Sequence, residues 1–282
     1  MTAILEKVNA DKGKIESHFH YLHQNPGVAF EEQTAATYIA GKLREWGYEV
    51  TEGIGKTGVV GQLKVGDGKA RIGLRADTDA LPVQEGSDLP YKSKIEGKSH
   101  MCGHDAHSAM LLGAAEYLAK TKNFNGTLNV IFQPAEEVMA GAPAMIADGL
   151  FEKFPMDVIF GMHNMPGLPV GKLHFTGGPI MAAVDNWEIE LTGVGSHGSM
   201  PEKSIDPLVA GAALVMSLQT IVSRNVAPMD AAVVSVGAFL AGNAGNVIPQ
   251  NAILRMSTRT RKPETRQMVL DKIRSITKAT AE

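Results

Sequence analysis

The chain has 282 residues, of which 44% are hydrophobic and 20% are charged, and 27 lysines and arginines against 30 aspartates and glutamates give a formal charge of −3. This composition is typical of an ordinary globular protein and excludes a disordered or fibrous chain. It also lacks the clustered basic face of a nucleic-acid binder, so a small-molecule partner is expected instead.

Up to residue 162, the predicted elements alternate between helix and strand. Apolar residues at helical spacing predict a helix over residues 32–46, with Gly47 as its C-terminal cap. Strands are predicted at 48–51, 59–65 and 72–74, a helix at 108–119, and buried strands at 127–132 and 158–162. This alternation indicates an α/β layer with crossover connections.

Beyond residue 183 the pattern changes to strand 187–191, helix 207–222, strands 231–239 and 253–258, and helix 264–278. The order β-α-β-β-α matches a split βαβ, ferredoxin-like (α+β) unit without its last strand, so the chain is expected to end within this domain. We therefore predict two domains, an incomplete α/β domain over residues 1–182 and an α+β domain over residues 183–282.

The segment His100 to His107 (HMCGHDAH) is the densest cluster of residues that can carry chemistry. Thiolate and imidazole are common metal ligands, and Gly103 allows a sharp turn that would aim Cys102 and His104 at one point. The alternative is a histidine-rich surface loop beside a buried free cysteine.

Acidic and histidine side chains follow three other predicted strands. Glu136 and Glu137 come after strand 127–132, His163 ends strand 158–162, and Asp79 follows strand 72–74. In open α/β sheets ligands bind beyond the carboxyl ends of the strands. One of the adjacent glutamates can bind metal while the other handles a proton, and Asp79 can orient a ligating imidazole. Separately, each has an ordinary explanation: acids that favour a helix dipole, a structural histidine, or a turn-forming aspartate.

Taken together, RADTDALP, MCGHDAH, QPAEE, GMHN, GVGSHGSMPEKSIDP, LQTIVSRNV and GNVIP resemble the M20 metallopeptidase family. The similarity is greatest to its amidohydrolase branch of hippurate hydrolases, N-acyl-amino-acid amidohydrolases and indole-acetyl-amino-acid hydrolases. The resemblance implies a zinc-peptidase-like α/β catalytic domain with an inserted lid and dimerisation domain. It also implies that the C-terminal part of the catalytic domain is missing from this chain.

The resemblance further implies two divalent metal ions, zinc or manganese, with cobalt or nickel also possible. By this resemblance Cys102 bridges the ions, His104 and His163 complete one site, and Glu137 contributes to the other. The family's remaining ligand, a histidine from a C-terminal segment, has no counterpart here. Glu136 becomes the general acid/base that serves a metal-activated water in hydrolysis of the amide bond of N-acyl amino acids.

Three residues of the second domain are candidates for substrate binding. By resemblance His197 reaches the reaction centre, in this chain or in a dimer partner, while a solvated loop residue is the alternative. Asn246 and Arg259 could bind the substrate's carboxylate, with arginine pairing in a bidentate manner, or could serve ordinary roles on the strand surface. A homodimer formed through the lid domain is expected.

Two other functions compete with the amidohydrolase. A cysteine hydrolase with Cys102 as nucleophile leaves QPAEE and GMHN without a purpose. A truncated paralogue or fragment would bind metal weakly and hydrolyse nothing.

The single cysteine argues against disulfides and favours the cytoplasm. No signal peptide is apparent, and the most apolar stretch, residues 231–242, is shorter than the ~20 residues of a membrane helix, so no membrane partner is expected.

Overall fold

The structure, a computed structural model, describes residues 2–282, which divide into two compact units between Pro169 and Val170. The sequence predicts this boundary at residues 182/183, immediately before the first strand of the second unit. The two positions differ because residues 170–182 form neither helix nor strand. Within this segment the carbonyl of Pro179 accepts a hydrogen bond from Arg261, so the segment packs with the second unit.

The first unit is built on a five-stranded sheet of order β1-β2-β4-β3-β5. Its strands are β1 (Glu49–Ile54), β2 (Gly58–Val65), β3 (Arg71–Asp77), β4 (Gly126–Gln133) and β5 (Val158–Gly161). β4, β3 and β5 are parallel, whereas β1 and β2 pair in antiparallel fashion. Because parallel neighbours need a crossover connection, helix α4 (His104–Thr121) links β3 to β4. The carboxyl ends of the three parallel strands therefore share one edge of the sheet.

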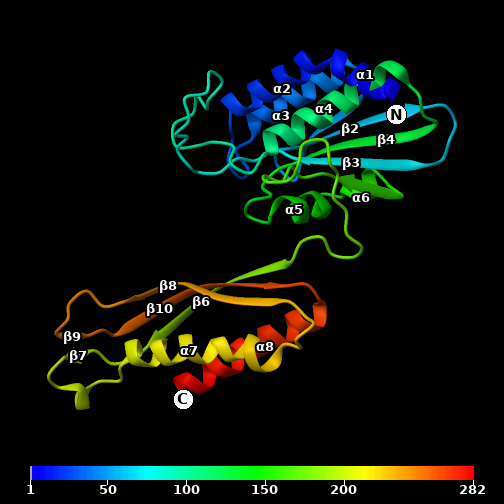
Figure 1. Cartoon of the computed structure of the whole chain (residues 1–282). Coiled ribbons are helices and arrows are strands. Elements are labelled where there is room, and N and C mark those ends of the chain that lie inside the picture. Colours follow the sequence, from blue (N-terminus) through cyan, green and yellow to red (C-terminus); the bar gives the residue numbers. More distant parts are fainter. Residues whose placement is uncertain (1) are drawn as a thin grey trace. The chain divides into compact units, whose positions relative to one another are not determined.

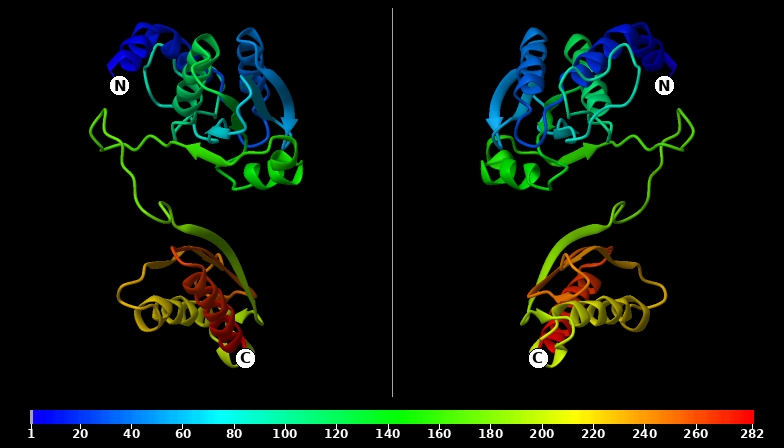
Figure 2. Two further views of the ribbon diagram at one scale, coloured as in Figure 1. Left: turned by 90° about the vertical axis from the view of Figure 1, so that its right-hand side faces the viewer. Right: turned by 90° about the vertical axis from the view of Figure 1, so that its left-hand side faces the viewer.

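Helices cover both faces of this sheet (Figures 1 and 2). On one face lie α2 (Lys12–Gln24), α3 (Gln33–Glu45) and α4, with α1 (Thr2–Ala10) beside α2; on the other lie α5 (Gly141–Ala147) and α6 (Leu150–Lys153). Since side chains alternate across a strand, Val130 and Phe132 of β4 pack in the core beneath α3 and α4. Ile131 instead packs with Met145 and Leu150 of α5 and α6. The two cores explain why β4 reads as a continuous apolar run.

The predicted elements of this unit are present, with three differences. β3 continues to Asp77, three residues beyond its predicted end, so this acid lies on the strand. α4 begins at His104 and not at Ser108, because Gly103 starts the helix from a left-handed conformation (φ 84°) without a side-chain cap. The prediction that the strand at 158–162 is buried was wrong: β5 is an edge strand paired with β3, and all its residues are exposed.

The second unit contains a three-stranded antiparallel sheet of order β6-β10-β8, made of β6 (Ala183–Thr192), β8 (Ala232–Ala241) and β10 (Asn251–Thr260). Helices α7 (Pro207–Asn225) and α8 (Pro263–Ala281) pack on one face of this sheet (Figure 1). β10 separates β6 from β8, which is the predicted split βαβ arrangement. A short ribbon of β7 (Ser196–His197) and β9 (Val247–Ile248) and a 3₁₀ turn, η1 (Pro201–Lys203), complete the unit.

Helix α7 is the one described helix that is long and apolar enough to cross a membrane, with a mean hydropathy of 1.3. Within the second unit it serves as a core helix, because Leu214, Leu218 and Ile221 are fully buried against the sheet and α8. Its opposite face exposes Val209 and Met216.

Candidate metal centre

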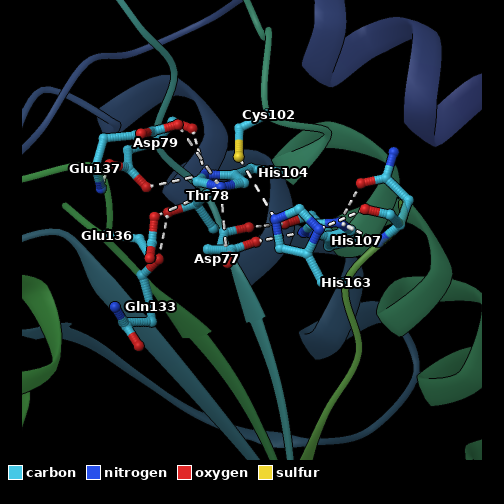
Figure 3. Close-up of polar contacts among 12 residues, drawn as sticks. Asp77, Thr78, Asp79, Cys102, His104, His107, Gln133, Glu136, Glu137 and His163 are labelled. Atoms are coloured by element: carbon cyan, nitrogen blue, oxygen red, sulfur yellow. Dashed lines mark hydrogen bonds and ion pairs between the residues drawn. The ribbon is translucent and has the colours of Figure 1, made fainter. Parts of the chain in front are cut away.

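The candidate site of the first unit lies where β3, β4 and β5 end beside the beginning of α4 (Figure 3). Asp79 follows β3, Glu136 and Glu137 follow β4, and His163 follows β5. Cys102 and His104 flank the left-handed Gly103 at the start of α4. Parallel pairing places these strand ends side by side, which brings together residues more than 80 positions apart in the sequence.

Three overlapping sets of potential ligand atoms converge at this edge, one of them formed by Asp77, His104 and His107 and the other two by residues predicted from the sequence. Cys102, His104 and His163 each offer a ligand atom within 4.8 Å of the others, and so do His104, Glu136 and Glu137. The Sγ atom of Cys102 lies 3.5 Å from Nε2 of His163. His104 belongs to all three sets, so the sulfur, the imidazoles and the adjacent acids form one continuous cluster.

Asp79 fixes the orientation of His104. The Nδ1 atom of His104 donates to the backbone carbonyl of Asp79 (2.8 Å) and lies 3.1 Å from its Oδ1. This hydrogen bond assigns the proton to Nδ1 and leaves the lone pair of Nε2 facing the cluster. The other carboxylate oxygen of Asp79 accepts a hydrogen bond from the backbone N–H of Glu137 (2.9 Å). Asp79 therefore holds two groups of the cluster at once.

Two buried atoms of the cluster, Nε2 of His104 and Oε1 of Glu137, have no hydrogen-bond partner among residues 2–282, and they lie 3.9 Å apart. Buried polar atoms are almost always paired, and both of these present lone pairs. A cation between them would satisfy both, and the combination of imidazole, carboxylate and thiol suits a divalent transition metal. The residues present therefore fit a metal ion.

The pKa shifts of the cluster reflect burial first and neighbouring negative charge second. Burial, together with the nearby Glu137 carboxylate, raises the pKa of the Cys102 thiol to about 11. Burial and the neighbouring Glu136 also raise the pKa of Glu137, although His104 opposes this. Burial lowers the pKa of His104, but its hydrogen bond to Asp79 and the surrounding acids outweigh burial and raise it overall. A cation would relieve this repulsion.

The raised pKa of Cys102 also bears on the cysteine-hydrolase alternative. A nucleophilic cysteine needs a lowered pKa, usually from a nearby positive charge or a helix N-terminus. The charged groups acting on this thiol are the carboxylates of Glu137, Glu136 and Asp77, which act in the opposite direction. This environment therefore disfavours a free thiolate nucleophile, and a thiolate here would need a cation beside it.

Glu136 and Glu137 differ in exposure although they are adjacent. The side chain of Glu137 is 21% exposed and that of Glu136 is 42% exposed, and Oε2 of Glu136 lies 3.8 Å from Nε2 of His104. Figure 3 shows both carboxylates beside the imidazole of His104. One acid of the pair is thus placed to bind a metal while the other reaches solvent next to it.

A second layer of residues was not assigned a role from the sequence. His107 donates from Nδ1 to Asp77 (2.7 Å), and its Nε2 accepts from the backbone N–H of Asn164 (3.0 Å). Burial opposes ionisation of Asp77, but the hydrogen bond from His107 and the Arg75 guanidinium outweigh it and hold the pKa of Asp77 well below its usual range. The sequence does contain a signal for them, because Asp77, His107 and Asn164 belong to the motifs RADTDALP, MCGHDAH and GMHN.

The candidates of the second unit do not form one group. Val247 of β9 pairs with His197 of β7, and the N–H of Gly198 donates to the carbonyl of Asn246 (2.8 Å), so His197 and Asn246 are neighbours. Arg259 lies near the opposite end of β10 from Asn251, about 27 Å along the strand. Asn246 is five residues before Asn251, so it lies toward the opposite end of the sheet from Arg259.

Comparison with known proteins places this geometry in a family context. The model of peptidase family M20/M25/M40 matches residues 73–259. The chain is 54% identical over 271 residues to the hippurate hydrolase of Campylobacter jejuni, an alignment that covers 96% of this chain and 70% of that protein.

Solved structures of similar proteins share the fold of this chain. A structure described as an aminohydrolase from methicillin-resistant Staphylococcus aureus superposes with a TM-score of 0.92 at 34% identity, covering 98% of this chain and 74% of that one. A dinuclear metal-binding peptidase of the M20 family from Bacillus subtilis superposes with a TM-score of 0.79 at 36% identity, covering 97% and 71%. The chain thus spans about seven-tenths of the length of these proteins.

Proposed function

This chain belongs to peptidase family M20/M25/M40, in the amidohydrolase branch that its motifs predicted, and we propose that it hydrolyses the amide bond of N-acyl amino acids. The observation that carries the proposal is the pair of unpaired buried atoms, His104 Nε2 and Glu137 Oε1, beside the solvent-exposed carboxylate of Glu136. The hippurate hydrolase relative supports a substrate in which an acyl group is joined to an amino acid.

In this proposal Cys102, His104, Glu137 and His163 would hold two divalent metal ions. Zinc or manganese suits these donors, and cobalt or nickel would also be accepted. When bound, such ions lower the pKa of water and polarise the substrate carbonyl. The chain prepares for them by directing His104 Nε2 and His163 Nε2 toward the cluster, since both Nδ1 atoms form hydrogen bonds to backbone carbonyls.

Glu136 acts as the general acid/base. Its carboxylate is close enough to the cluster to take a proton from the attacking water, and its exposure leaves room for substrate. It then returns the proton to the nitrogen of the departing amino acid. Glu137, which is less exposed and bears an unpaired oxygen, is the better ligand of the two.

The second unit supplies substrate contacts in this proposal. The guanidinium of Arg259 pairs with the substrate carboxylate, and His197 and Asn246 form a second contact group at the β7–β9 ribbon. Because these groups lie at opposite ends of the sheet, we propose that they serve different sites, as they would in a homodimer formed through residues 183–282. A cytoplasmic location completes the proposal, since the chain has a single cysteine.

The test is a substrate panel on metal-free protein that has been reloaded separately with zinc, manganese, cobalt or nickel. Benzoyl, acetyl and indole-acetyl derivatives of amino acids are incubated with each form, and release of the free amino acid is measured. We expect metal-dependent release that Glu136→Gln abolishes. Release that is unchanged after complete metal removal, or no release with any metal and acyl group, would contradict the proposal.

A further inference from the structure

Outside the metal centre, the first unit contains a buried carboxylate whose position needs an explanation. Glu32 immediately precedes α3 and is only 1% exposed. Its Oε1 accepts hydrogen bonds from the backbone N–H groups of Ala135 (2.9 Å) and Phe30 (3.0 Å), and its Oε2 accepts one from the hydroxyl of Thr57. Burying a carboxylate is costly unless donors compensate for the lost water, so this site is built around the acid.

Ala135 is the residue that joins this carboxylate to the metal centre. It is fully buried, it directly precedes Glu136, and it has a positive φ of 49°. Residues other than glycine rarely adopt this left-handed conformation, so the surroundings must enforce it. Its carbonyl accepts from the N–H groups of Ala140 (3.2 Å) and Gly141 (3.0 Å), and a β-carbon on Gly141 would lie 1.5 Å from the carbonyl oxygen of Pro134.

The turn that carries the two glutamates is therefore held from both sides by acids that do not belong to the ligand sets. Glu32 binds the N–H of Ala135, and Asp79 binds the N–H of Glu137. Glu136 lies between these two anchored residues. Figure 3 shows the carboxylates of Glu136 and Glu137 beside the imidazole of His104. The direction of both carboxylates thus depends on a turn to which Glu32 and Asp79 each contribute one hydrogen bond.

We infer that Glu32 is a positioning residue for the reaction: by holding Ala135 in its left-handed turn, it sets the places of Glu136 and Glu137. The inference rests on the proposed function for the roles of those two glutamates. The contact itself joins residues 103 positions apart and stands on the geometry alone.

The geometry also says which feature of Glu32 matters. Oε1 accepts hydrogen bonds from both backbone N–H groups, whereas Oε2 accepts only one, from the hydroxyl of Thr57. A hydroxyl can also accept a hydrogen bond, so it can pair with a donor placed at the Oε2 position. A glutamine can therefore keep all three contacts, with its carbonyl at the Oε1 position and its amide donating to Thr57. An aspartate keeps the charge but is one methylene shorter, so it cannot reach Ala135 and Thr57 together. We therefore expect the length of the side chain at position 32, and not its charge, to decide whether the turn at Ala135 is kept.

The experiment compares Glu32→Gln with Glu32→Asp in the full chain. In metal-free protein, amide hydrogen exchange is measured on peptides that cover residues 133–141. Zinc affinity is then measured by competition with a chromophoric chelator, and kcat and KM are measured on the substrate that the panel identifies. Glu31→Gln is the matched control, because Glu31 is exposed and pairs with Lys98.

For Glu32→Asp we expect faster exchange at 133–141, a zinc affinity and a kcat each about 10- to 100-fold lower, and an unchanged KM. Glu32→Gln and Glu31→Gln should stay within a small factor of the unsubstituted protein. The inference is overturned if Glu32→Asp changes only overall stability, or if Glu32→Gln loses as much as Glu32→Asp. Should the unsubstituted protein hydrolyse no N-acyl amino acid, the proposed function fails, while exchange and zinc affinity still decide the role of Glu32.

Discussion

Gly103 offers a direct test of how the ligand positions are set. It separates Cys102 from His104 with a φ of 84°, and a β-carbon there would lie 2.3 Å from Oδ1 of Asn164 and 2.5 Å from its Nδ2. The backbone N–H of that asparagine donates to His107. Replacing Gly103 by alanine therefore adds a strained backbone conformation and a clash at the point where the motifs of α4 and β5 meet.

The expected magnitude follows from these two contributions. An alanine in the left-handed region costs ~1–2 kcal/mol, and displacing Asn164 forfeits a hydrogen bond of about 1 kcal/mol. The metal-free loop can relieve the clash by moving, but metal binding must restore the turn, so the cost appears in metal affinity. A total of about 2–3 kcal/mol corresponds to a roughly 30- to 150-fold weaker affinity for Gly103→Ala.

The assay is zinc titration against a chromophoric chelator, paired with urea unfolding of the metal-free protein. Gly97→Ala is the matched control, because Gly97 has a similar φ of 71° but nothing within 4 Å of a new β-carbon. It should lower the free energy of unfolding and leave zinc affinity unchanged. If Gly103→Ala binds zinc as tightly as Gly97→Ala does, the turn at Gly103 does not set the ligand positions.

Three further predictions concern the base, a buried histidine and the second core. Glu136→Gln should keep its metal content while kcat falls by about 10²- to 10⁴-fold; loss of metal would instead make Glu136 a ligand. Hydrogen bonding to Asp105 raises the pKa of His23 against the effect of burial, so the stability lost in His23→Gln should be largest below pH 6.5 and shrink as pH rises through the raised pKa. Urea unfolding at several pH values checks this, and a loss that grows with pH would contradict it. Leu214→Ala should lower the free energy of unfolding by about 2–5 kcal/mol, because Leu214 is fully buried. Met216→Ala, on the exposed face of α7, should lower it by under about 0.5 kcal/mol. Equal losses for the two variants in urea unfolding would refute the assigned packing.

Much of the first unit could be predicted because its signals are local. The helical spacing over residues 32–46 and the apolar run of β4 reflect faces buried by helices, so the pattern and the structure agree. β5 shows the limit of this reasoning. Its residues are as apolar as those of β4, yet composition does not reveal whether a neighbouring element covers them.

The ligand cluster could be proposed because parallel strands end at a common edge. That rule connects His104, Glu137 and His163 without any knowledge of side-chain geometry. The contacts of Glu32 with Ala135 and of His107 with Asn164 were missed for the opposite reason. They span 103 and 57 positions and depend on turns whose backbone conformation no spacing rule specifies.

The edge strand β5 leads directly into the metal centre. Four residues pair it with β3, both of its faces are exposed, and His163 follows two residues after it ends. A cation bound by His163 and Cys102 would cross-link the segment that follows β5 to the turn that precedes α4. At a metal concentration one hundred times Kd, such binding adds about 2.7 kcal/mol to the stability of the folded state. The amides of residues 158–161 should then exchange more slowly in metal-loaded than in chelated protein, which would make the ion part of the unit's architecture as well as of its chemistry.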